Sequence, residues 1–118
     1  PEWVDNPVTR FRTLLAIARN CQDTPSINSP QLMMRVLDKL ANDVQHFPFD
    51  ENDPYSLLFA DDVSFVLELA YPTAMETDPQ RFRQIAERIH NAMPTRDTQA
   101  VLNRIDNAHS KAPYRQRT

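Results

Sequence analysis

The sequence predicts an all-α fold, a bundle of five helices, from its prolines, its lack of glycine and the spacing of its apolar residues. The chain has 118 residues and ten prolines, and four of these directly follow a residue that can cap a helix. A cap side chain accepts a hydrogen bond from the first turn, and proline at the first helical position loses only a donor that has no partner there. The four predicted helix starts are Asn6-Pro7, Ser29-Pro30, Asp53-Pro54 and Asp78-Pro79.

The second observation is that the chain contains no glycine, whereas average usage predicts about eight. Short hairpin turns favour glycine, so its absence argues against a strand-rich fold. Phosphate-binding loops, dinucleotide-binding turns and the hydrolase nucleophile elbow also need glycine, because their backbone is strained or approaches a ligand closely. We expect none of these sites in its usual form.

Five stretches place apolar residues at the spacing of a helix. The fourth is the clearest amphipath, with Phe82, Ile85 and Ile89 on one side, and Thr95 is the predicted cap of the fifth. The third is apolar around most of its circumference, which is typical of a helix packed on several sides and predicts a central position. Its polar strip consists of Ser56, Ala60, Asp61, Ser64 and Glu68. The expected helices cover residues 7–22, 30–46, 54–71, 79–93 and 95–112.

A faint internal repeat leaves two architectures open. Ser29-Pro-Gln and Asp78-Pro-Gln begin similar stretches 49 residues apart, close to the period of about 40 to 47 residues in HEAT and armadillo hairpins. The fold is either a closed five-helix bundle or two HEAT-like helical hairpins plus a fifth helix. The length fits one domain, which we expect at residues 1–112, followed by a basic C-terminal tail at 113–118.

No group of residues has the spacing of a catalytic or metal site. Asp61 and Asp62 are adjacent, and neighbouring helical residues point about 100° apart, so the two carboxylates cannot share a proton as a dyad does. The three histidines form no i, i+4 pair, and Cys21 lies on the apolar side of the first helix, where a buried hydrophobic role fits best. We therefore expect no enzymatic activity, no cofactor and no metal.

The location of the protein follows from what the chain lacks. No apolar run reaches the roughly 18 residues that span a bilayer, and a single cysteine cannot form an internal disulfide. The chain also begins without Met. We interpret it as a segment of a larger intracellular protein, cytoplasmic or nuclear, with no membrane partner.

Charge is divided unevenly along the chain. Nine acids and no Lys or Arg lie between Asp43 and Asp78, whereas eight bases and three acids follow Asp78. The two regions either pair inside the fold, or the acidic one attracts a basic peptide, or the basic one binds nucleic acid or an acidic segment. The residues of this alternative basic surface are Arg81, Arg88, Arg104, Lys111, Arg115 and Arg117.

The strongest candidate contact element is the connection at residues 46–55. Two aromatic residues flank Pro48, and acids crowd the next helix start. The aromatic residues either close the end of the core or anchor a partner, and Phe49 is the predicted anchor. The candidate partner-binding residues are Phe47, Phe49, Asp50, Glu51, Asp53 and Tyr55.

The sequence therefore predicts a non-enzymatic protein–protein interaction or scaffolding module. Grooves between helices are the usual recessed surface of such a fold, so the expected partner is a helix or linear motif laid into one of them. The alternative is a nucleic-acid or nucleoprotein adaptor that uses the basic C-terminal part. Self-association is a third possibility, and the sequence predicts no oligomeric state.

Overall fold

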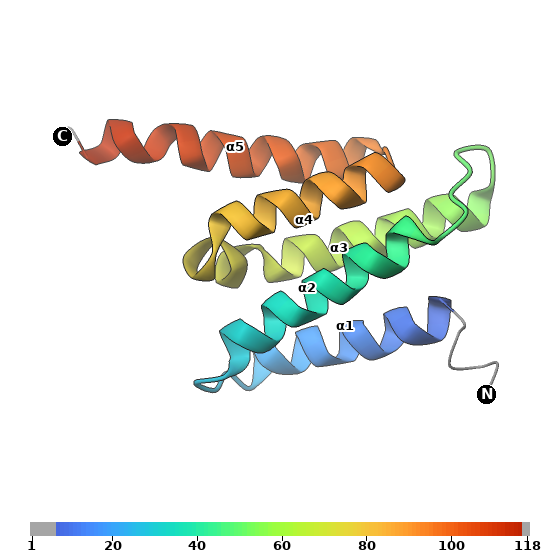
Figure 1. The fold of residues 1–118 in the computed structure, drawn as a ribbon, viewed down its shortest axis with the longest axis horizontal. Coiled ribbons are helices and arrows are strands. Elements are labelled where there is room, and N and C mark those ends of the chain that lie inside the picture. The colour runs from blue at the N-terminus through green and yellow to red at the C-terminus, as the bar shows by residue number, and fades with distance from the viewer. Residues whose placement is uncertain (1–6, 117–118) are drawn as a thin grey trace.

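The computed structural model describes the backbone of residues 7–116 and the side chains of residues 9–108. Within that range the chain forms five α-helices and no strand, which confirms the predicted all-α bundle (Figure 1). The helices are α1 (Pro7–Asp23), α2 (Ser29–Gln45), α3 (Pro54–Thr77), α4 (Pro79–Ala92) and α5 (Arg96–Gln116).

Asp53 and Asp78 form the two aspartate caps that the sequence predicts. The Asp53 carboxylate accepts the N–H of Tyr55, and the Asp78 carboxylate accepts the N–H of Arg81, each at 3.1 Å. Proline follows both caps at the start of its helix, where the missing N–H costs no hydrogen bond.

The predicted cap of α5 is also formed. The Thr95 hydroxyl accepts the N–H of Thr98, and the Thr98 hydroxyl accepts the N–H of Thr95, each at 3.1 Å. Two donors of the helix start are thus satisfied reciprocally, as in a capping box.

The start of α2 differs from the prediction. Ser29 is the first residue of the helix, Asn28 occupies the cap position, and no side chain caps α2. The Ser29 hydroxyl instead accepts the N–H of Ser26 at 2.8 Å, because serine readily bonds backbone in a neighbouring turn. Asn6, the predicted cap of α1, lies outside the described residues.

α3 continues to Thr77, although the prediction ends it at Tyr71. Pro72 lies inside the helix on its exposed side. An internal proline costs about 3 kcal/mol, and the burial of Ala74 two residues later offsets part of this cost. The helix ends where the Asp78 N–H bonds the Ala74 carbonyl at 2.9 Å.

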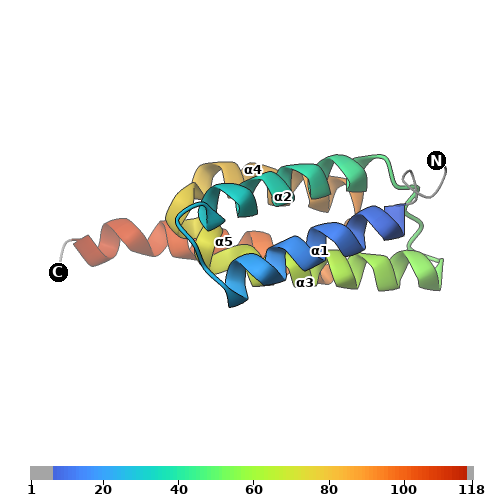
Figure 2. The ribbon, with the colours of Figure 1, turned by 90° about the horizontal axis from the view of Figure 1, so that it is seen from below.

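α5 also extends beyond residue 112, the predicted end of the domain. It includes Pro113 and ends at Gln116, and its last part projects beyond the other helices (Figures 1 and 2). The division into a domain at 1–112 and a tail at 113–118 stays a prediction.

The five helices form two layers. α2 and α4 lie side by side in one layer, and α1, α3 and α5 form the other (Figure 2). The helices of one layer run opposite to those of the other (Figure 1). α3 lies between α1 and α5 and contacts every other helix, so its predicted central position is confirmed. The HEAT-like pairing of hairpins stays a prediction.

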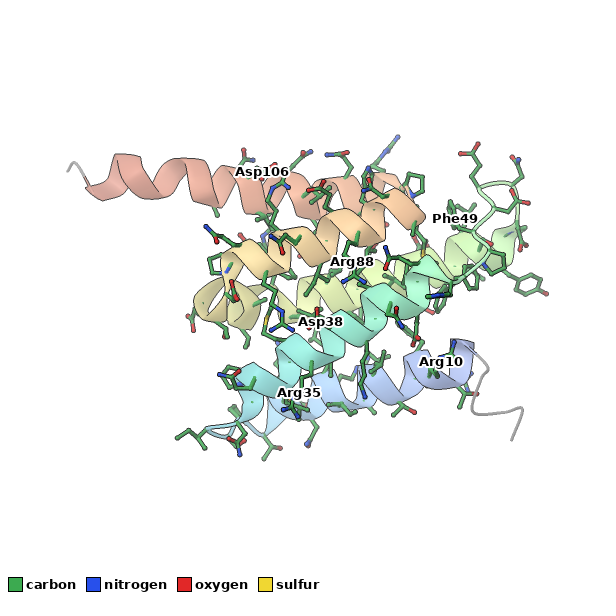
Figure 3. The ribbon with its side chains drawn as sticks, viewed as in Figure 1. Arg10, Arg35, Asp38, Phe49, Arg88 and Asp106 are labelled. Carbon is green, nitrogen blue, oxygen red and sulfur yellow. The ribbon has the colours of Figure 1, made fainter. Side chains whose placement is uncertain are left out.

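The core lies between the layers and is almost entirely apolar. α4 buries Phe82, Ile85 and Ile89, the three residues predicted to point inward. Polar side chains link the neighbouring helices α2 and α4 at the surface. Arg81 pairs with Asp38, and Arg88, which lies between α4 and α2 in Figure 3, donates to the Gln45 side chain at 2.7 Å.

The polar strip predicted on α3 is not a solvated strip. Ser56, Ala60 and Ser64 are buried, and only Asp61 and Glu68 of this strip are exposed. Small residues at these positions lie in the buried part of the helix, close to its neighbours. The side of α3 that faces solvent is instead partly apolar.

Candidate partner-binding surface

The connection between α2 and α3 carries the residues predicted to bind a partner. The Phe47 ring packs on Phe59 with centroids 4.6 Å apart, and Phe49 also contacts the core. Phe49 lies at the end of the bundle (Figure 3), and both side chains are half-buried. Phe47 and Phe49 thus help to close the end of the core, and their contact with a partner stays a prediction.

The acids of this connection shape the turn into α3. The Asp50 N–H donates to the Ser56 hydroxyl at 3.2 Å, and the Asp50 carboxylate accepts the N–H of Asn52 at 2.9 Å. Asp53 caps α3. Glu51 and Tyr55 remain exposed, and Tyr55 reaches 80%.

The alternative basic residues do not share one face in the part of the chain whose side chains are described. Arg81 and Arg88 point to α2, whereas Arg104 pairs with Glu68 of α3 at 2.5 Å. The side chains of Lys111, Arg115 and Arg117 lie outside the described residues. The Arg104–Glu68 pair is an internal link between the acidic and basic regions.

Arg83 has its partners within the basic region itself. It pairs with Asp106 at 2.7 Å and with Glu87 at 2.5 Å. These hydrogen bonds, that to Asp106 first, raise the pKa of the Arg83 guanidinium above its ordinary value. All these groups are at the surface, and the Arg83–Asp106 pair links α4 to α5, whereas Arg83 and Glu87 lie one turn apart on α4 itself.

The side of α3 that faces away from α2 and α4 is the most apolar exposed surface among the described residues. Leu58 is 61% exposed and Phe65 47%, and because they are seven residues apart they share one side of the helix. Tyr55 begins this side, and acids lie between the apolar residues. We call this surface the outer face of α3; it consists of Tyr55, Leu58, Asp61, Asp62, Phe65 and Glu68.

α1 and α5 border the outer face with arginines. Arg19 of α1 lies over the Phe65 ring, with its guanidinium carbon 5.4 Å from the centroid. Arg104 of α5 lies 3.8 Å above the Tyr71 ring while it pairs with Glu68. Aromatic and acidic residues of α3 thus contact one guanidinium group from α1 and one from α5.

A hollow of about 270 Å³ lies between α3 and α5 at the edge of the outer face. Three of its residues are acids and none is basic. It is lined by Asp61, Ser64, Phe65, Glu68, Asp97 and Ala100.

A larger hollow of about 580 Å³ lies between α1 and α2. Its charged residues are mostly paired already, Arg10 with Asp43 at 3.3 Å and Asp38 with Arg81. Because these charges are compensated within the fold, the hollow indicates no particular partner.

No group of three or more His, Cys, Asp or Glu among the described residues could hold a metal ion. Cys21 is buried, and His90 contacts the Thr98 hydroxyl at 2.6 Å where α4 turns into α5. Across the described residues, every helix is too short or too polar to cross a membrane.

Comparison of the chain with models of protein families, with curated proteins and with solved structures gave no match. The surface of the fold is therefore the feature from which a function can be inferred. The sequence pattern missed the outer face of α3, since a helix that is apolar around its circumference does not indicate which side stays open. The signal present in the sequence is the pair Leu58 and Phe65, which share a side with Asp61 and Asp62.

Proposed function

We propose that this chain is a non-enzymatic protein–protein interaction module of a larger intracellular protein, and that its outer face of α3 binds a partner helix. The observation that carries the proposal is the exposure of Leu58 and Phe65 on one side of the central helix. Large apolar side chains gathered on one exposed surface are typical of interface anchors.

The chemistry of the outer face favours a basic amphipathic partner. Leu58 and Phe65 offer apolar contacts two turns apart, which fits the i, i+7 anchors of a helix in a groove. Asp61 and Asp62 lie between them, and Asp97 lies at the α5 border. Opposite charge on the partner would guide its approach and its register. The predicted contact residues at the 46–53 connection adjoin this face through Tyr55.

The test compares substitutions on and off the outer face. Leu58→Ser and Phe65→Ser remove the proposed anchors, and Ile27→Ser removes an equally apolar residue that is 93% exposed in the α1–α2 connection. Each variant is used to capture proteins from cell lysate. We expect the proteins retained by the parent to be retained by Ile27→Ser and lost by the other two. Capture that is unchanged in Leu58→Ser and Phe65→Ser would contradict the proposal.

The second proposal is the nucleic-acid or nucleoprotein adaptor. It is favoured by the basic residues Lys111 and Arg115, which belong to α5, the helix whose last part projects beyond the bundle (Figure 1). Phosphate contacts make affinity fall steeply with salt. A titration of RNA binding against salt distinguishes the two: a steep slope that Lys111→Gln and Arg115→Gln reduce supports the adaptor.

A further inference from the structure

The contact between α3 and α5 changes from one helical turn to the next. The two helices run side by side in the same direction (Figure 1). At one level Arg104 fills the contact, paired with Glu68 at 2.5 Å and stacked 3.8 Å from the Tyr71 ring. One turn earlier on α5 the residue is Ala100, and at that level the hollow described above opens.

Three polar side chains around this hollow, Asp61, Ser64 and Asp97, have no described side-chain partner, whereas Glu68 is paired with Arg104. Ser64 is 5% exposed, and its hydroxyl oxygen is buried with no hydrogen-bond partner among the described residues. A buried hydroxyl without a partner costs free energy. No ion pair joins Asp61 or Asp97 to another described side chain. Asp61, Asp97 and Ser64 therefore offer hydrogen-bond acceptors and negative charge that no described side chain matches with a donor.

We propose that this hollow binds the guanidinium group of an arginine on the partner. The inference rests on the proposed function, because the hollow shares Asp61, Phe65 and Glu68 with the outer face of α3. The carboxylates of Asp61 and Asp97 accept guanidinium N–H groups, and the Ser64 hydroxyl, which has no partner of its own, accepts another. The Phe65 ring also lines the hollow and already carries the Arg19 guanidinium at 5.4 Å, so the partner's guanidinium would share this ring with Arg19.

Arginine fits this hollow better than lysine. A guanidinium is planar, carries five donors and is weakly hydrated, so it can stack on an aromatic ring while it bonds carboxylates. An ammonium is compact and strongly hydrated. Arg104 of α5 is bound in this way within the fold, because its guanidinium contacts both the Glu68 carboxylate and the Tyr71 ring of α3.

Two small cations test the inference on the whole chain. Ethylguanidinium and ethylammonium are titrated separately, and the backbone amides are followed by NMR. Ethylguanidinium should bind more tightly and shift the amides of Ser64, Phe65 and Ala100. Equal binding of the two cations, or shifts that spare these amides, would overturn the arginine assignment.

Neighbouring aspartates provide a matched control. Asp61→Asn and Asp97→Asn should each weaken ethylguanidinium binding about two- to fivefold, the range for an exposed ion pair. Asp62→Asn makes the same charge change one residue away, outside the lining of the hollow, and should leave binding unchanged. An equal loss in Asp62→Asn would mean that the cation responds only to overall charge.

A substitution on α5 can fill the hollow from within. Ala100→Arg places a guanidinium one turn before Arg104, and we expect it to abolish ethylguanidinium binding and raise the melting temperature by about 2 to 4 °C. Ala100→Gln adds length without charge and should do neither. Ethylguanidinium binding that survives in Ala100→Arg would contradict the proposal.

Leu58→Ser separates this inference from the proposed function, because Leu58 belongs to the outer face and not to the hollow. Loss of capture by Leu58→Ser without ethylguanidinium binding to the parent would retain the outer face and reject the arginine site. Ethylguanidinium binding with capture unchanged in Leu58→Ser would retain the guanidinium site and reject the partner-binding face.

Discussion

α3 and α4 begin in the same way, each with an aspartate cap followed by proline, but they divide their surfaces differently. α4 buries one apolar side and exposes its charged residues. α3 buries Val66 and Leu67 completely and still exposes Leu58 and Phe65 on its other side. The layer of α2 and α4 covers one side of α3, and α1 and α5 cover its two flanks. The remaining side of α3 therefore stays open to solvent.

The contrast between α3 and α4 indicates which surface of a helical bundle is a candidate for binding. An amphipathic helix encodes its own orientation, because only one side can be buried favourably. A helix that is apolar all around is oriented by its neighbours, and what they leave uncovered is apolar surface in water. Covering such apolar surface with a partner removes it from water, which is favourable. Substitutions on the two sides of α3 and at the helix starts test this contrast.

The largest effect should come from the buried side of α3. Leu67→Ala should lower the free energy of unfolding by about 2 to 5 kcal/mol, because it leaves a cavity at a fully buried position. Leu58→Ala makes the same change on the exposed side of the same helix and should cost much less. Chemical denaturation measures both. Equal losses of unfolding free energy in the two variants would mean that both sides of α3 contribute equally to the core.

The caps should have intermediate effects that are alike in the two helices. Asp53→Ala and Asp78→Ala each remove a carboxylate that accepts an N–H of the first turn, and each should cost about 0.5 to 2 kcal/mol. Asp53→Asn and Asp78→Asn keep an acceptor and should restore most of the loss. Unchanged midpoints in both alanine variants would show that these caps do not stabilise the helices.

The ion pair between α3 and α5 should contribute less. A double-mutant cycle of Glu68→Gln and Arg104→Gln should give a coupling of about 0 to 1 kcal/mol, because both side chains are roughly half exposed. The coupling should decrease as salt is added. A coupling that does not change with salt would indicate that the hydrogen bond between the two side chains, rather than their charge, carries the interaction.

The smallest effect on stability should come from the outer face. Phe65→Ser should change the free energy of unfolding by no more than about 0.5 kcal/mol, as is usual for surface positions. The same variant should lose partner capture. A large loss of stability would mean that Phe65 supports the fold, and the contrast between the two sides of α3 would then be weaker than we infer.

Local chemistry determined much of this fold from the sequence. The starts of α3, α4 and α5 depend on caps only a few residues long, and the buried side of α4 follows from its apolar spacing. Ser29 shows the limit of such reasoning, because its hydroxyl had two local choices and bonds Ser26 rather than capping α2. For the binding site, the sequence pointed to the 46–55 connection and gave no indication of the hollow.

Which surfaces remain open depends on how the five helices pack. The end of α3 beyond Pro72 depends on burial of Ala74 against neighbouring helices, which no local signal records. The exposure of Leu58 and Phe65 depends on which sides of α3 the other four helices occupy. The hollow depends on Ala100 of α5 and Ser64 of α3 lining the same space, although these two helices are distant in sequence. Caps and amphipathic sides act within a few residues and can be inferred from the sequence, whereas an uncovered side is a property of the whole packing arrangement.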